Sequence, residues 1–398
     1  MTAFATYNFY VDCDNDGNFT GAYDEITSLV KAADWRMGRD YASQLTGRTV
    51  SASAEIVLDN YDDRFSSFNS SSPIYGKVLP GRKVKITMTV SAVTQTMFIG
   101  YLEVIEPIPG TSKQQSVAVL KAYGPLAYIN QRKVNVPLQE AVYTGATVTT
   151  ILDQIGWPVA DRSIDTGQTR MNYWWTGGVS STALSALRDI EDTEAGFLRE
   201  TKDGKIAFED REHRMKGAHL VSQATYTNST SGTLRYSQIV QEDPMREIYN
   251  IFRAEVYNFQ TDTLQVLWTL AESGESGPAI GPGETRVFYA SVSGEISAAW
   301  PWTTPVPLVD YLAYDGPSLE ANDYTAQVDV VVVKYDTLMK ISITNNAAIT
   351  LYMVRLMARG IPLLSSDTMI VIVEDATSKT KYGERTYPLP GKWIPSTS

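Results

Sequence analysis

The stretch KVKITMTV, residues 83–90, alternates apolar and polar side chains without interruption. Its apolar positions share one face of the expected strand: Val84, Ile86, Met88 and Val90. Successive side chains of a β-strand point to opposite faces of the sheet, so a period of two predicts a strand with one buried face. Residues 51–58 repeat the pattern, with apolar side chains at Ala52, Ala54, Ile56 and Leu58. Both stretches are typical of an antiparallel sheet.

More strands are predicted around these two. Residues 98–105 and 115–122 have strand-like composition. Glycine, proline, asparagine and aspartate, which favour turns, gather at Asn15–Gly17, Asp59–Asp63 and Pro80-Gly81. The sequence therefore predicts that residues 1–133 form an antiparallel β domain.

The middle of the chain changes to a helical period. Residues 147–155 place apolar side chains one helical turn apart, at Val148, Ile151, Leu152 and Ile155. A second helix is predicted over residues 181–194. Two short strands then flank Asp203-Gly204, which is a strong hairpin signal. Residues 134–218 are therefore predicted to form a small α/β domain.

Strands return in the last part of the chain. Residues 324–333 are apolar on both faces at their centre. Residues 339–344 and 351–358 flank a turn at Asn345-Asn346. Residues 219–398 are thus predicted to form a second β domain.

Composition limits the function classes. Of the 398 residues, 43% are hydrophobic and 20% charged, as in an ordinary folded protein. The formal net charge of −11 argues against binding to a phosphate backbone, which requires clustered lysine and arginine. A negative wall would instead keep a passing duplex from sticking. The single cysteine, Cys13, excludes an internal disulfide. Neither a membrane-spanning run of ~18 apolar residues nor a signal peptide is expected.

Residues 11–19, VDCDNDGNF, carry three aspartates at alternate positions: Asp12, Asp14 and Asp16. With Gly17 they match the first half of a calcium-binding EF-hand loop. The twelfth position of that loop is Tyr23, where a bidentate glutamate is required. A tight turn after a strand is therefore favoured. Whether the aspartates hold an ion incidentally is left open, and no metal-binding residue is assigned.

No group of residues predicts catalysis or cofactor binding. The two histidines, His213 and His219, lack metal-ligating partners in sequence and are expected on the surface. No HExxH motif and no G-x-S-x-G elbow occurs. Residues 281–286, GPGETR, lack the third glycine of a dinucleotide fingerprint and are expected to be a loop before a strand. No catalytic residue and no cofactor is therefore assigned.

Two aromatic clusters leave alternatives open. Residues 173–175 read Tyr-Trp-Trp, and residues 300–302 read Trp-Pro-Trp. Exposed rings would stack on sugars, whereas buried rings would anchor a core or an interface. The second interpretation is favoured.

Residues 47–86 resemble the tail-tip proteins of long-tailed bacteriophages, the T4 hub-like minor tail or baseplate hub proteins. The matching motifs are the strand end Leu58-Asp59-Asn60, the turn Asp63-Arg64-Phe65-Ser66, the segment Ser72–Gly76 and Pro80-Gly81-Arg82. The acidic segment Asp24–Thr27 fits the start of such proteins. Residues 184–211 are similar to their helix and hairpin, and residues 329–364 and 373–385 to their C-terminal part. Four matches in family order make the resemblance strong.

The resemblance implies a mainly β fold in which two tube-type antiparallel β-barrel domains are separated by the α/β unit. It implies a homotrimer whose pseudo-sixfold ring closes or extends the tail tube at the distal end of the tail. The implied partners are a distal tail protein or the tail tube, the tape-measure protein, and tail fibre or tip proteins. DNA would pass through the ring without specific binding. The expected location is the virion tail tip, after synthesis in the host cytoplasm.

Two other functions are weighed against this one. A receptor-binding or carbohydrate-binding tail protein would use the aromatic clusters. A tail-associated cell-wall hydrolase would need a catalytic constellation, which the sequence does not contain. The chain also ends soon after the Tyr382-Gly383 motif, where related proteins often continue, so a shortened C-terminus is one expectation.

Overall fold

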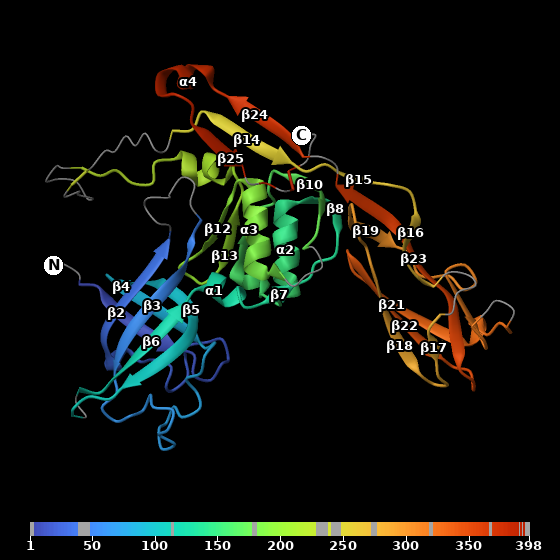
Figure 1. Cartoon of the computed structure of the whole chain (residues 1–398). Coiled ribbons are helices and arrows are strands. Elements are labelled where there is room, and N and C mark those ends of the chain that lie inside the picture. The colour runs from blue at the N-terminus through green and yellow to red at the C-terminus, as the bar shows by residue number, and fades with distance from the viewer. Residues whose placement is uncertain are drawn as a thin grey trace. The chain divides into compact units, whose positions relative to one another are not determined.

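The computed structural model describes residues 4–38, 48–112, 115–176, 181–227, 238–239, 248–271, 277–317, 321–365, 368–389, 391 and 393–394 (Figure 1). They form two compact units. The first unit comprises residues 1–133, 143–168 and 182–249, and the second comprises residues 134–142, 169–181 and 250–398.

The first unit contains a six-stranded antiparallel sheet in the order β1-β4-β5-β6-β3-β2. Its strands are β1 (Thr6–Val11), β2 (Val30–Gly38), β3 (Val50–Asp59), β4 (Lys83–Val90), β5 (Val93–Ile108) and β6 (Val117–Tyr123). The predicted strands are confirmed. All four apolar positions of residues 51–58 are buried. Residues 83–90 follow the prediction only at their start, because the pairing of β4 with β5 shifts between Ile86 and Thr87, and Thr87 is buried.

The sheet is rolled so that one face encloses a single core. Its two edge strands approach each other, since the rings of Tyr7 in β1 and Trp35 in β2 lie 5.6 Å apart. The segment before β2 also pairs with β1, where the Ile26 N–H donates to the Phe9 carbonyl at 2.9 Å. The enclosed core includes Ile56 and other side chains of β1 to β6. Rolling protects the backbone groups of β1, which would otherwise form an open edge.

Helices and a hairpin complete the first unit. They are α1 (Pro125–Ile129), α2 (Thr144–Gln154), β9 (Arg162–Ile164), α3 (Ala183–Glu194), β12 (Phe197–Glu200) and β13 (Ile206–Glu209). α3 begins where the Thr182 hydroxyl accepts the Ser185 N–H and ends at Ala195 in a left-handed conformation. The predicted hairpin turn is confirmed, because Gly204 has a φ of 76°. α2 and α3 lie side by side (Figure 1).

The second unit is built on one long strand, β23 (Leu351–Ser365), which pairs with five shorter strands. They are β15 (Phe259–Thr261), β16 (Gln265–Ala271), β17 (Ala279–Ile280), β19 (Ile296–Trp302) and β20 (Tyr311–Tyr314). A second sheet has the order β18-β22-β21, with β18 (Thr285–Ser291), β21 (Val328–Lys334) and β22 (Leu338–Asn345). The two sheets share one core, which includes Met353 and Ile341.

A third sheet of this unit has the order β24-β14-β25. It consists of β14 (Ile251–Val256), β24 (Met369–Glu374) and β25 (Thr386–Leu389), and α4 (Ala376–Tyr382) joins the last two. The remaining strands are short: β7 (Lys133–Val134), β8 (Gln139–Tyr143), β10 (Arg170–Trp174) and β11 (Ser181–Thr182). The predicted fold class, mainly β with an α+β part, is confirmed. Among the described residues no helix is both long and apolar enough to cross a membrane.

One buried carboxylate joins three elements of the first unit. Glu200, at the end of β12, is 4% exposed. It accepts hydrogen bonds from the backbone N–H groups of Ala52 (2.7 Å) and Leu126 (2.6 Å) and from the Ser51 hydroxyl (2.9 Å). These donors belong to β3 and to the first turn of α1, so the contacts, called here the Glu200 latch, fix the hairpin, the sheet and α1 together. A Cβ at Gly124 would lie 2.1 Å from the carboxylate, so glycine leaves the space the latch needs.

We predict that Glu200→Gln lowers the free energy of unfolding by about 1–3 kcal/mol, because the amide N–H₂ would face a backbone donor. Urea denaturation at neutral pH measures the change. Ser51→Ala is the control: it removes one donor to the carboxylate and the acceptor of the Ala127 N–H but leaves the carboxylate itself, and a smaller loss is expected from it. Equal losses from both variants would contradict the latch.

We also predict that the effect of Glu200 on the free energy of unfolding depends on pH. Burial raises the pKa of the Glu200 carboxyl above its ordinary value of 4.5. A carboxyl whose pKa is raised on folding favours the folded state when it is protonated. This contribution to the free energy of unfolding is complete below the ordinary pKa and is lost as the pH rises through the folded-state pKa. The penalty of Glu200→Gln should therefore be larger at about pH 4.5 than at about pH 7.5. Unfolding curves of the two proteins at both pH values test this, and a penalty that grows with pH would contradict it.

Candidate functional site: a motif loop, an aromatic pocket and uncovered strands

The loop between β3 and β4 carries the motif residues and is held by its own side chains; Gly47, at the start of the motif, lies outside the described residues. Asn60 is 2% exposed, and its side-chain oxygen accepts the Phe65 N–H at 3.0 Å. The Ser72 hydroxyl donates to the Arg64 carbonyl at 2.7 Å. Arg64 also donates to the Asp62 carboxylate at 2.6 and 2.8 Å, which lowers the pKa of that carboxyl. The motif polar residues therefore fix the shape of the loop.

The loop covers a cavity of about 240 Å³. Arg64, Phe65, Ile74 and Val78 from the loop and Ile105 from β5 line it. Phe65 and Ile74 also belong to the core of the rolled sheet. The motif loop therefore packs some of its side chains into the core of the first unit.

Two asparagines explain the C-terminal motifs in the same way. Asn345 is fully buried, and its side-chain amide donates to the carbonyls of Ile280 (2.9 Å) and Ile349 (2.8 Å), which fixes the predicted turn. Asn250 donates to the Gly383 carbonyl and accepts the Arg385 N–H, both at 2.8 Å. These bonds fix the chain where it leaves α4. Each motif position thus satisfies backbone groups that would otherwise be unpaired.

The three aspartates form the predicted turn. Asn15 and Gly17 have φ values of 58° and 81°, as the turn requires. Asp12 is buried, and its carboxylate accepts the Gly17 N–H at 3.0 Å. Asp14 pairs with Lys77 at 3.0 Å, and Asp16 accepts the Asn18 N–H. No cluster of three ligating side chains that would hold a metal occurs among the described residues.

The histidines lie where the hairpin ends. His213 is partly exposed and contacts the Asp165 carboxylate at 2.7 Å through Nδ1, and His219 is exposed with its ring 5.0 Å away. Asp165 also accepts the Asp210 N–H at 3.0 Å, so this contact extends a network of structural hydrogen bonds.

The aromatic clusters are mostly core. Trp174, Trp175 and Trp302 are 1%, 5% and 2% exposed. Trp175 packs against Phe259 and Trp393, with ring centroids 5.2 and 4.8 Å apart. Rings buried in this way offer no face to a sugar, and they stabilise their own chain rather than a second one.

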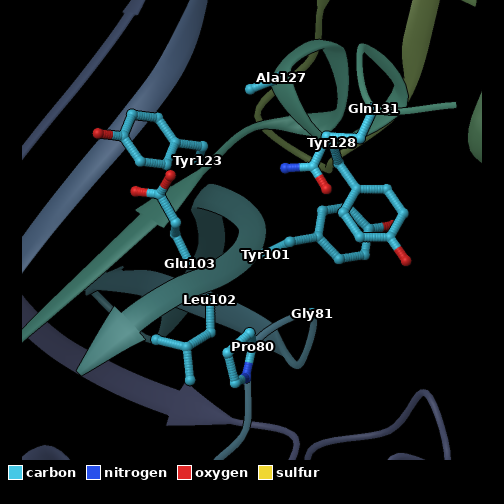
Figure 2. Close-up of a pocket in the computed structure, with 9 residues that line it drawn as sticks. All are labelled: Pro80, Gly81, Tyr101, Leu102, Glu103, Tyr123, Ala127, Tyr128 and Gln131. Carbon is cyan, nitrogen blue, oxygen red and sulfur yellow. The ribbon is translucent and has the colours of Figure 1, made fainter.

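An aromatic pocket of about 150 Å³ lies in the first unit between β5, β6 and α1 (Figure 2). Tyr101 and Tyr128 stack on one side of it, with ring centroids 4.2 Å apart and planes 17° apart. Tyr123 and Glu103 lie on the opposite side (Figure 2). Trp157 contacts both stacked rings. No sequence pattern indicates this pocket, because its residues come from separate segments.

The second unit leaves apolar strands uncovered. β24 reads Met-Ile-Val-Ile-Val over residues 369–373, and these side chains are between 43% and 65% exposed. β24 pairs with β14 along one edge, and its other edge has no partner strand in the described chain. The outer face of the β18-β22-β21 sheet likewise exposes Val287, Tyr289, Val331 and Val333. Exposed apolar strands with a free edge mark interaction surfaces.

We predict that Asn60→Ala destabilises the protein by about 1–3 kcal/mol, because the buried Phe65 N–H would lose its acceptor. Ser71→Ala, an exposed change in the same loop, is the control and should alter stability by less than about 0.5 kcal/mol. Thermal unfolding of the three proteins compares them. Similar midpoints for Asn60→Ala and the unaltered protein would show that the loop does not depend on this bond.

Comparison with known proteins gives structural neighbours only. No protein-family model and no curated protein matches the sequence. A tail protein from Neisseria meningitidis MC58 is 11% identical, with a TM-score of 0.37 and coverage of 63% of each chain. The 43 kDa tail protein of prophage MuSo2 from Shewanella oneidensis is 10% identical, with a TM-score of 0.33, 51% of this chain and 53% of that one being covered.

A third similar structure is the c3393 protein of E. coli, described as a type VI secretion component with similarity to the T4 tail proteins gp27 and gp5. It is 8% identical, with a TM-score of 0.27 and coverage of 92% of this chain and 74% of that one. The present chain spans less than two thirds of the length of the two tail proteins. Phage tail proteins are thus among the structures that this chain is similar to.

Proposed function

We propose that this chain is a structural protein of a phage tail, a hub at the distal end of the tail tube. Three copies form a pseudo-sixfold ring to which each contributes two tube-like β domains. The ring closes or extends the tube and passes DNA at infection. Its partners are the tail tube or a distal tail protein, the tape-measure protein, and fibre or tip proteins. The domains of this proposal are residues 1–133, 134–218 and 219–398.

The observation that carries the proposal is the uncovered strand β24. Five consecutive apolar side chains exposed on both faces of a strand, beside a free edge, would make a lone monomer prone to aggregation. A permanent assembly that covers them removes this liability, and obligate interfaces of about 2,000 Å² or more are typically rich in such side chains. A structural role in an assembly accounts for these strands, whereas a free-standing enzyme does not.

Charge supports the passage of DNA. A net charge of −11 distributed over the chain repels phosphates and disfavours a strong attachment of the duplex. A ring of this composition would let DNA slide without holding it.

We predict that the purified protein is a trimer by native mass spectrometry and forms rings that dock on one end of its own tail tubes in negative-stain images. Val373→Lys, in β24, should shift the population to monomer, because it places a charge in the apolar interface. Val93→Lys is the matched control: Val93 is 59% exposed and Val373 is 65% exposed, but Val93 lies at the β4–β5 turn.

An unaltered protein that stays monomeric and ignores tail tubes would overturn the hub function. A trimer that survives Val373→Lys would leave the hub standing and exclude β24 from its interface.

A further inference from the structure

The aromatic pocket of Figure 2 is preformed. Beside Tyr101 in β5, the Leu102 carbonyl accepts the Gly81 N–H at 2.7 Å, which fixes the Pro80-Gly81 turn to this strand. Tyr128 is part of α1, whose first turn is fixed by the Glu200 latch. Trp157 packs on both rings, with centroids 6.0 and 6.4 Å away. Since the walls are already ordered, a ligand loses little free energy to their arrangement.

The pocket carries one free negative charge. Glu103 lines it, is exposed, and has neither a hydrogen bond nor an ion pair among the described residues. Two cations of this part of the first unit already have partners. Arg132 donates to the Tyr128 hydroxyl at 3.1 Å and lies over that ring, and Lys121 pairs with Glu106 at 3.0 Å.

The other polar groups of the pocket are neutral. Burial raises the pKa of the Tyr101 hydroxyl well above its ordinary value, so the phenol keeps its proton. Gln131 turns its side-chain amide toward the space between the two walls (Figure 2). A carboxylate opposite stacked tyrosines is complementary to a flat cation, because the ring faces attract positive charge and the carboxylate accepts two parallel N–H donors.

We propose that this pocket binds an arginine side chain supplied by a partner protein. The guanidinium lies against the tyrosine wall and donates to Glu103, and the methylene groups of the arginine side chain contact Pro80. Arginine fits better than lysine, since a planar guanidinium both stacks on rings and forks onto a carboxylate. A volume of about 150 Å³ suits one side chain rather than a helix. The negative net charge of the chain favours the approach of a basic segment.

The pocket lies on the first unit and the uncovered strands on the second. The inference therefore holds or fails independently of the trimer: the partner is any protein segment that presents an exposed arginine.

The test uses the full chain and two peptides, acetyl-Gly-Arg-Gly-amide and its citrulline counterpart, which has nearly the same shape but no charge. Saturation-transfer difference NMR titrations measure their binding. The arginine peptide should bind saturably and the citrulline peptide at least about fivefold more weakly. Glu103→Gln should weaken binding of the arginine peptide about fivefold, whereas Asp203→Asn, which removes an exposed carboxylate in the β12–β13 turn of the same unit, should not.

Each remaining outcome overturns the proposal. Equal binding of both peptides would show that only the aromatic wall matters. An unchanged affinity in Glu103→Gln would remove the carboxylate from the site. Methyl glucoside that binds and displaces the arginine peptide would make the pocket a sugar site, and the absence of saturable binding of the arginine peptide would leave no such site.

Discussion

The first unit depends on a carboxylate that has no cationic partner in direct contact within the described parts of the chain. Glu200 is buried, and three hydrogen-bond donors from β3 and α1 offset part of the desolvation of its charge. Burying a charge costs free energy, so such a residue persists only where its bonds specify an arrangement. Here it fixes how the hairpin, the rolled sheet and the first turn of α1 meet. The same arrangement fixes the position of one wall of the aromatic pocket, because Tyr128 lies in α1.

Much of the fold could be predicted because local patterns determine it. Alternation placed Ile56 and Leu58 in a core, and the Asp203-Gly204 turn marked the hairpin. The start of α2 was predicted three residues too late, because Tyr143 precedes the helix without a capping side-chain bond and so gives no sequence signal. The tube-like assembly of the β regions is a proposal, since pairing within one chain does not determine pairing between chains.

Candidate sites were harder to predict than strands. Apolar residues in a sequence predict burial, but they do not show whether the same chain or a partner chain covers them. Trp174 and Trp302 are covered by their own chain, whereas Ile372 in β24 is 56% exposed. The aromatic pocket brings together Pro80, Tyr101 and Tyr128, which no spacing rule connects. Only the packing of the elements shows that these residues share a wall.

The way in which the chain alternates between its two units has a consequence for how the protein is made. The chain enters the second unit at residue 134, leaves it at residue 143, returns at residue 169, leaves again at residue 182 and returns for good at residue 250. The second unit therefore cannot be completed until strands from the last third of the chain have been synthesised. Contacts between segments that are distant in the sequence also form slowly in folding. During synthesis the early segments must remain soluble until β23 emerges. For the same reason no single cut in the chain separates one unit from the other.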